Sequence, residues 1–258
     1  AFYNAHCHSA MTLFRGIGED LPLRRWLDEA ILPAEDKLNF RRTYYGSRLA
    51  IAEMIRNGIV SFSDMYMFVD ATAEAVLEAG VKANLSRSIV SFDPDIKPEE
   101  DARFAEAVRL AEQYNGAGDG RLKIDMSLHA EYSNVEATCR YVAAYAAEHG
   151  LRMQLHASET EAEHLQSIER HGMTPIAYFA SLGVLDVPTS AAHCVWCTDE
   201  DLVVMKEKGV FPVHNPTSNC KLGSGVMNLR AMLDAGLPVA LGTDGAASNN
   251  SLDILKEM

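Results

Sequence analysis

The feature that most constrains this sequence is a short apolar run that ends in a histidine or an acidic residue, repeated along the chain. In residues 151–159, Leu-Arg-Met-Gln-Leu-His-Ala-Ser-Glu, His156 closes the run and Glu159 follows three residues later. The same pattern recurs at 2–8 (His6 and His8), 122–129 (His129), 190–193 (His193), 210–214 (His214) and 237–244 (Asp244). Such runs are typical of buried strands in a parallel sheet. The repetition predicts one polar site at the ends of many strands.

Helical patterns separate these runs. We expect strands at 1–8, 59–62, 81–85, 122–128, 151–156, 190–192, 210–213 and 237–242. We expect helices at 23–31, 36–57, 71–79, 98–114, 135–149, 160–171, 174–182, 199–208 and 227–235, and loops at 11–33 and 215–225. Eight strands alternating with helices in 258 residues predict an α/β fold, the closed (β/α)₈ TIM barrel. An open doubly wound sheet is the alternative, but its glycine-rich turn is missing after the first strand.

Composition excludes several classes of protein. The net charge is −13 and no basic cluster is present, which argues against nucleic-acid binding. No apolar run approaches the roughly 18 residues of a membrane span, and no signal peptide is visible. The five cysteines are odd in number and scattered, which favours a reducing compartment over a disulfide framework. We therefore expect a cytoplasmic protein with neither a nucleic-acid nor a membrane partner.

The two ends of the sequence indicate an excerpt of a longer chain. The first residue is Ala1, and the first expected strand begins almost at once. The last residue, Met258, falls inside a helical pattern that starts at Leu252. We expect residues 1–258 to form a single barrel domain, with most of the last helix of the barrel outside it.

The polar strand ends are suited to hold a metal ion. They are His6, His8, His129, His156, Glu159, His193, His214 and Asp244. Because His6 and His8 are two residues apart, they share one face of a strand, and imidazoles with a carboxylate are good ligands for Zn²⁺ or Fe²⁺. A solvated strand end would explain that pair alone, but His156 and Asp244 shift the balance towards a metal. Three or four protein ligands leave room for a water whose pKa falls to roughly 7, which predicts hydrolytic chemistry.

Glu159 has two interpretations. A carboxylate at a helix start is favoured by the helix dipole, and this explanation is sufficient for Glu161 and Glu163 nearby. Glu159 differs because it lies three residues beyond His156, at the expected mouth of the barrel. A carboxyl group at that position can transfer protons beside a metal site.

Two other patterns have simpler explanations. Cys194 and Cys197 form a C-x-x-C pattern, which is found in redox pairs and zinc knuckles. No second C-x-x-C exists, so we interpret both as packed thiols after the sixth strand. The stretch from His156 to His164 does not match H-E-x-x-H, so it is no zincin helix.

Five motifs together resemble a known superfamily. They are Asn4-Ala-His6-Cys-His8-Ser-Ala-Met-Thr-Leu, His156-Ala-Ser-Glu159-Thr, Ala192-His193-Cys, His214-Asn-Pro-Thr-Ser-Asn and Leu241-Gly-Thr-Asp244-Gly-Ala-Ala-Ser-Asn-Asn. In kind and order they resemble the amidohydrolase superfamily. The branch concerned contains 5'-methylthioadenosine/S-adenosylhomocysteine deaminases with guanine and chlorotriazine-type aminohydrolases. The resemblance covers the whole chain.

The resemblance implies the chemistry of a metal-dependent deaminase. One divalent ion, zinc or iron(II), would be bound by His6, His8, His156 and Asp244. Asp244 and His193 would orient and deprotonate the bound water, and Glu159 would carry a proton to a ring nitrogen. Attack of the hydroxide on the amine-bearing carbon would then release ammonia.

The resemblance also implies where a substrate lies. Glu35 would hold the ribose hydroxyls, Arg87 and His129 would contact the substrate, and Trp26 would line the side that receives a thioether. The expected substrate is a small adenosine-type nucleoside: 5'-methylthioadenosine, S-adenosylhomocysteine or adenosine. The family's flanking β-sandwich is absent from residues 1–258, and Arg103 is the nearest match to a second arginine that reaches the amino-acid tail in some relatives. Whether the protein forms a homo-oligomer stays open.

Three alternatives stay open as well. The enzyme could act on a free base or a triazine instead of a nucleoside. A binuclear cyclic-amide hydrolase would carry a bridging lysine at the end of the fourth strand, where this sequence has Leu128-His129-Ala130 and places Lys123 at the strand start. A non-enzymatic metal-binding barrel would not need both Glu159 and Asp244, and both are present.

Overall fold

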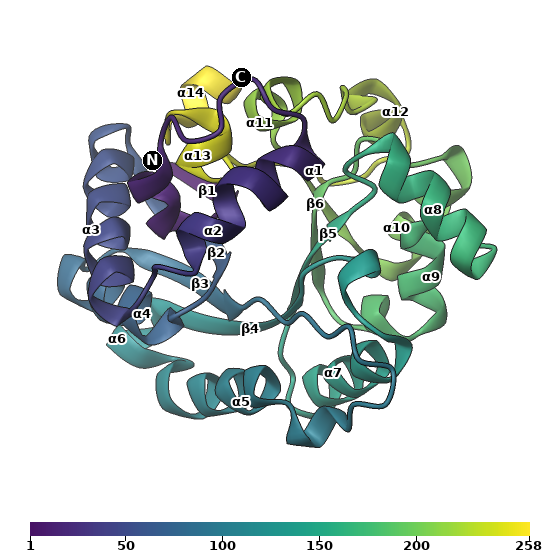
Figure 1. Ribbon diagram of the computed structural model, residues 1–258, viewed down its shortest axis with the longest axis horizontal. Helices are drawn as coiled ribbons and strands as arrows, with labels where there is room; N and C mark the ends of the chain where they lie inside the picture. Colours follow the sequence, from purple (N-terminus) through teal and green to yellow (C-terminus); the bar gives the residue numbers. More distant parts are fainter.

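A computed structural model describes all 258 residues, and its eight strands follow one another around a barrel (Figure 1). Every neighbouring pair from β1–β2 to β7–β8 is parallel. The strands are β1 (Phe2–Cys7), β2 (Ile59–Tyr66), β3 (Lys82–Arg87), β4 (Leu122–Leu128), β5 (Met153–Ala157), β6 (Thr189–His193), β7 (Phe211–His214) and β8 (Ala240–Leu241). This architecture confirms the α/β prediction of a (β/α)₈ TIM barrel.

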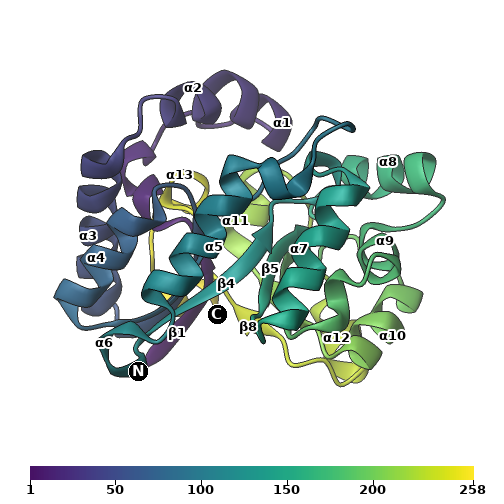
Figure 2. The same ribbon diagram turned by 90° about the horizontal axis from the view of Figure 1, so that it is seen from below.

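Helices surround the barrel and also cover one of its ends. The outer helices are α3 (Phe40–Arg56), α4 (Val69–Ala79), α5 (Ala102–Tyr114), α7 (Glu136–Glu148), α8 (Glu161–His171), α9 (Pro175–Ser181), α10 (Asp199–Lys208) and α12 (Leu229–Asp234). Figure 2 shows α1 (Leu23–Arg25) and α2 (Leu32–Glu35) lying beyond one end of the strands. None of the helices combines the length and the apolar composition needed to span a membrane.

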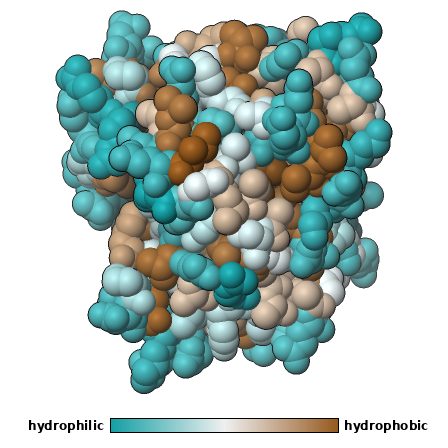
Figure 3. Space-filling view, turned by 90° about the vertical axis from the view of Figure 1, so that its right-hand side faces the viewer, coloured by the Kyte–Doolittle hydropathy of each residue, from teal (hydrophilic) through white to brown (hydrophobic).

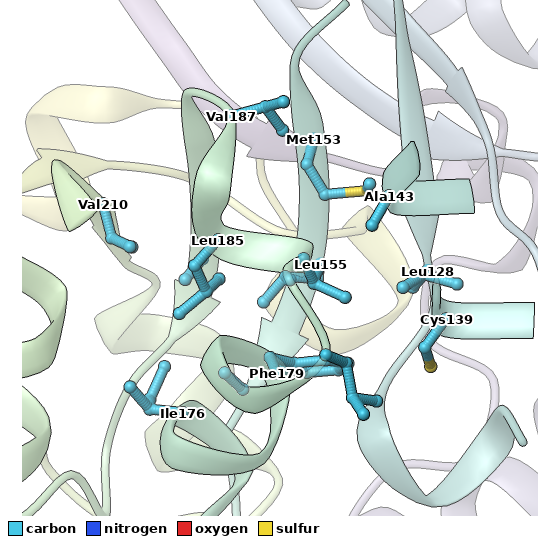
Figure 4. Packing of buried hydrophobic residues seen from close by; sticks show 14 of the residues in the cluster. Leu128, Cys139, Ala143, Met153, Leu155, Ile176, Phe179, Leu185, Val187 and Val210 are labelled. Carbon is cyan, nitrogen blue, oxygen red and sulfur yellow. The ribbon is translucent and has the colours of Figure 1, made fainter. Parts of the chain in front are cut away.

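Alternation along the strands decides which residues face the core. In β5, Met153, Leu155 and Ala157 pack outward into a hydrophobic cluster with α7 and α9, whereas the intervening Gln154 and His156 are not part of it. Figure 4 shows Leu155 close to Phe179 of α9 in this cluster. Because side chains alternate across a strand, the apolar set that anchors β5 directs His156 to the barrel interior.

Side chains close the seam between β8 and β1. The amide of Asn4 donates to Thr243 Oγ1 at 2.7 Å, and its oxygen accepts the Thr243 backbone N–H at 3.0 Å. One residue further, the Asp244 N–H donates to the His6 carbonyl at 3.0 Å. The two segments that carry predicted metal ligands are therefore joined directly.

Several expected boundaries were wrong. Residues 23–35 are helical throughout, because the π-helix η2 (Trp26–Ile31) connects α1 to α2. The wider π turn lies just before Pro33, which has no N–H to donate. Glu35 therefore ends a helix rather than lying in a loop. The expected loop 215–225 contains α11 (Pro216–Lys221), which starts with proline at a favoured position.

The remaining elements are short. They are η1 (Ser9–Phe14), η3 (Pro98–Glu100), α6 (Ala117–Gly120), η4 (Glu131–Ser133), η5 (Val184–Asp186), α13 (Ala246–Asn249) and α14 (Ile254–Glu257). α13 was not expected from the sequence, and β8 is shorter than expected. On the face drawn in Figure 3, hydrophobic residues lie scattered among hydrophilic ones, with no single continuous apolar patch.

Candidate metal centre and active site

The ends of β1, β5, β6 and the segment after β8 converge on one buried site. The ligand atoms of His6, His8 and His156 lie within 4.8 Å of one another, and so do those of His6, His193 and Asp244. His6 and His8 leave the same face of the first strand, as their spacing requires. The structure thus brings together all four residues that the resemblance assigned to the metal.

Backbone carbonyls orient two of the imidazole rings. His8 Nδ1 lies 2.6 Å from the Met65 carbonyl, and His156 Nδ1 lies 2.7 Å from the His129 carbonyl. A carbonyl oxygen only accepts hydrogen bonds, so each Nδ1 is the protonated nitrogen. The lone pair of each ring is therefore on Nε2, and such outer hydrogen bonds are the usual support of metal-binding histidines.

Asp244 provides the negative charge of the site. Its Oδ1 lies 3.2 Å from His8 Nε2 and 3.6 Å from His6 Nε2. Its Oδ2 accepts hydrogen bonds from Ser218 Oγ at 2.6 Å and Ser248 Oγ at 2.9 Å. Burial acts to raise the pKa of Asp244, but the two histidines outweigh it and hold the pKa well below its ordinary value. Asp244 is therefore an anionic side chain with a fixed orientation, as a metal ligand would require.

The donor set fits one divalent metal ion. Burial lowers the pKa of His6 to about 4, and His6 Nε2 is a buried nitrogen without a hydrogen-bond partner. Burial also lowers the pKa of His156 far below its usual range. At His8, burial is outweighed by Asp244, which raises the pKa of His8 to about 9, so this position favours positive charge. Neutral imidazoles, an inward-facing lone pair and a buried carboxylate are the donors that zinc-type ions select.

His193 stands at the edge of this centre and is held by Asn219. Its Nδ1 lies 2.7 Å from Asn219 Oδ1, so the amide oxygen accepts from Nδ1–H. His193 Nε2 is then the free nitrogen, 3.7 Å from Glu159 Oε2. His193 Nε2, which can accept a proton, therefore lies next to the carboxyl group of Glu159 at the side of the histidine and Asp244 cluster.

Glu159 is buried at the mouth of the barrel, with 7% of its surface exposed. Its Oε1 accepts a hydrogen bond from Ser224 Oγ at 3.2 Å. Burial raises the pKa of Glu159 above its ordinary value. A raised pKa makes a carboxyl group a better proton donor near neutral pH.

Three strand ends carry strained backbone. Ser158, His193 and Asp244 have φ angles of +48°, +73° and +57°, in the left-handed region that non-glycine residues rarely adopt. Such conformations cost on the order of 1–3 kcal/mol each and persist only where surrounding contacts enforce them. All three lie within or beside the cluster of His6, His8, His156, His193 and Asp244, so the contacts around this cluster enforce a strained backbone.

Two of the expected substrate residues also reach this site. The Tyr66 hydroxyl donates to Glu35 Oε1 at 2.6 Å, and the Tyr66 ring lies 5.8 Å from the His8 ring. Burial raises the pKa of Glu35. The His129 ring lies 4.9 Å from that of His156. Glu35 therefore reaches the mouth of the barrel from the end of α2, and His129 reaches it from the end of β4.

The remaining candidates, Arg87, Trp26 and His214, have different surroundings. Arg87 Nε donates to Glu106 Oε2 of α5 at 2.6 Å, and its Nη1 donates to the Ser88 carbonyl at 2.6 Å. Trp26 is 4% exposed and packs in a hydrophobic cluster that also contains Tyr66. His214 ends β7, and burial lowers its pKa, but it belongs to neither ligand group. Arg87 and Trp26 thus have partners other than the clustered histidines and Asp244, and His214 lies outside both ligand groups although His193 contributes to the lowering of its pKa.

The residues that hold the site in place were not predicted from the sequence, and one of them, Glu163, was interpreted only as a helix-start carboxylate. They are Asp64, Glu163, Ser218, Asn219, Ser224 and Ser248. Ser218 and Asn219 fall inside the His214-Asn-Pro-Thr-Ser-Asn motif, which was the one signal that could have revealed them. The backbone N–H of Ser9 donates to Asp64 Oδ2 at 3.1 Å, so Asp64 supports the segment after His8.

The fold and the site together define a (β/α)₈ barrel with a metal centre at the carboxyl ends of its strands. The model of the Amidohydrolase family matches residues 1–258. The chain therefore belongs to the amidohydrolase family, as the motifs indicated.

Curated relatives share about two fifths of their residues with the chain. A 5-methylthioadenosine/S-adenosylhomocysteine deaminase of Dictyoglomus thermophilum is 44% identical over 257 residues, which is 99% of this chain and 59% of that protein. A 5'-deoxyadenosine deaminase of Methanothermobacter thermautotrophicus is 44% identical over 255 residues, again 99% and 59%. The chain thus spans about three fifths of the length of these relatives.

Solved structures resemble the whole barrel. An adenosine deaminase from Xanthomonas campestris with bound zinc has a TM-score of 0.92 and 34% identity, covering 99% of this chain and 58% of that one. A guanine deaminase from C. acetobutylicum has a TM-score of 0.90 at 23% identity, covering 98% and 62%. At that lower identity the likeness concerns the fold alone.

Proposed function

We propose that this chain is the catalytic barrel of a metal-dependent deaminase acting on an adenosine-type nucleoside. The observation that carries the proposal is the placement of Glu159 and His193 side by side next to four metal-ligand side chains. Relatives named as deaminases of 5-methylthioadenosine, S-adenosylhomocysteine or 5'-deoxyadenosine support the substrate class. A cytoplasmic location and a small-molecule partner belong to the same proposal, and the homo-oligomeric state stays open.

Zinc is the proposed ion, with iron(II) as the alternative. His6, His8, His156 and Asp244 would hold it, and the zinc-bound structural neighbour supports this choice. When bound, such an ion supplies Lewis acidity, which makes water a strong nucleophile near neutral pH. One ion per chain is expected, because the end of β4 carries His129 rather than a bridging lysine.

The protein side chains move the protons. Asp244 and the free Nε2 of His193 accept a proton from the attacking water, and Ser218 keeps Asp244 oriented while it does so. Glu159 gives its proton to a ring nitrogen, which makes the amine-bearing carbon electrophilic. Water adds to that carbon, the proton held by Asp244 or His193 passes to the amine, which leaves as ammonia, and Glu159 takes back a proton from the new hydroxyl group as the carbonyl forms. Its raised pKa suits Glu159 to both donation and recovery of the proton.

Substrate selection is proposed to depend on Glu35. One of its oxygens accepts the Tyr66 hydroxyl, and the carboxylate can still accept hydrogen bonds from a ribose diol. His129 would contact the substrate from the end of β4. Arg87 would have to exchange Glu106 for the substrate, and Trp26 would shape the thioether side from within its cluster.

An ammonia-release screen of the full-length protein with added zinc tests this function. The panel is 5'-methylthioadenosine, S-adenosylhomocysteine, 5'-deoxyadenosine, adenosine, guanine, cytosine and a triazine. We expect the largest kcat/KM for one of the adenosine derivatives. A preference for guanine, cytosine or the triazine would overturn the nucleoside assignment, and no ammonia from any compound would overturn the deaminase itself.

A further inference from the structure

The buried carboxylate of Glu163 holds the turn that presents Glu159. Glu163 is the third residue of α8 and is 6% exposed. Its Oε2 accepts the backbone N–H of Glu159 at 2.7 Å, and its Oε1 accepts that of Ser158 at 3.1 Å. Glu163 itself is fixed, because its own N–H donates to Thr160 Oγ1 at 3.1 Å. One carboxylate therefore binds two consecutive N–H groups at the junction between β5 and α8.

This junction needs such support because its backbone is strained. Ser158 has a φ of +48°, and it is the residue that turns the chain from His156 towards Glu159. Its carbonyl accepts the N–H groups of Val195 and Trp196, both at 3.0 Å. The strained turn is therefore held on its carbonyl side by the segment after β6 and on its N–H side by Glu163. A strained conformation persists where neighbouring contacts enforce it.

We propose that Glu163 is a positioning residue that acts through Glu159. The inference rests on the proposed function, in which Glu159 transfers the proton. Glu161 is exposed and is the first residue of α8, two residues before Glu163, so it could interact with the helix dipole equally well. Glu163 differs because its side chain is buried and both of its oxygens bind the peptide groups that orient Glu159.

A double-mutant cycle in the full-length, zinc-loaded protein tests this role. Glu163→Ala is made in the wild type and in Glu159→Gln, with Glu161→Ala as the matched control. A misplaced catalytic group can cost up to about 100-fold, so we expect Glu163→Ala to lower kcat roughly 10- to 100-fold with KM nearly unchanged. In the Glu159→Gln background the same change should alter kcat less than about twofold, because residues that act as a unit are not additive. Equal factors in both backgrounds would overturn the proposal.

Amide hydrogen exchange gives a second readout that does not depend on turnover. Glu163→Gln keeps one acceptor oxygen and serves if the alanine variant does not fold. We expect faster exchange across residues 157–160 in Glu163→Gln than in Glu161→Gln, at unchanged zinc content. Unchanged exchange would contradict the positioning role. Near-normal turnover of Glu159→Gln alone would instead contradict the proposed function, and the exchange result would still decide the role of Glu163.

Discussion

Removing the Glu35 carboxylate should separate nucleosides from free bases. Glu35 reaches the mouth from α2, where one oxygen is shared with the Tyr66 hydroxyl. A ribose diol can donate two further hydrogen bonds to this carboxylate, and a bond to a charged group contributes about 1.5–3 kcal/mol. Because Tyr66 already uses part of the carboxylate, we expect a net loss of at least about 1.4 kcal/mol, which is tenfold in kcat/KM.

The assay compares 5'-methylthioadenosine with adenine in Glu35→Ala and in the wild type. Asp36→Ala is the matched control, because Asp36 is the adjacent exposed carboxylate and its loss changes the net charge equally. We expect kcat/KM for the nucleoside to fall 10-fold or more, as an order-of-magnitude figure, while deamination of the base barely changes. Equal losses for both substrates, or a nucleoside rate that Glu35→Ala leaves intact, would refute the ribose contact.

Three further variants test the site and the fold. Glu159→Gln should keep its zinc and its circular-dichroism spectrum but lose about 100-fold in kcat, as expected for a proton-transfer residue; near-normal turnover would return it to a helix-start role. Asn219→Ala leaves His193 Nδ1–H without its partner and should lower kcat roughly tenfold at unchanged zinc content. Phe179→Ala, in the hydrophobic cluster between β5 and the outer helices, should lower the free energy of unfolding by about 3–5 kcal/mol in urea denaturation.

The convergence of the metal ligands was predictable because of two simple periodicities. Residues two apart on a strand share a face, which placed His6 with His8. Parallel strands in a barrel end on the same side, which placed His156 and Asp244 near them. Apolar runs located the strands, so the fold and the gathering of polar strand ends followed from periodicity, whereas the choice of four ligands among those residues came from the resemblance to the amidohydrolase superfamily.

Contacts between distant segments were not predictable in the same way. The partner of Arg87 is Glu106 on α5, and no local pattern pairs the two. Trp26 is buried in a cluster whose members come from separate parts of the chain. Asn219 and Ser224 likewise bind side chains far away in the sequence, His193 at the end of β6 and Glu159 just beyond β5. Sequence patterns identify the groups that carry chemistry more readily than the groups that orient them.

Local structure also departed from expectation where backbone geometry competes with propensity. Glu35 was expected in a loop region between Pro33 and a helix that starts at Asp36, yet the π turn before Pro33 lets the helical segment continue to Glu35. Glu163 was interpreted as a dipole-favoured helix-start residue, but its carboxylate folds back onto the peptide groups of Ser158 and Glu159. In both cases the deciding interaction follows from a backbone conformation that periodicity does not reveal.

The dependence of turnover on a bound metal ion can be tested by removing that ion and returning it. Ammonia release from 5'-methylthioadenosine is followed before chelation, after complete metal removal, and after zinc is returned, with the metal content of each sample determined. The proposed ligands belong to two overlapping groups that share His6, so we expect one ion per chain, loss of turnover with that ion, and recovery on its return. Full turnover by the metal-free protein, or two ions per chain in the active form, would contradict a mechanism that depends on a single metal ion.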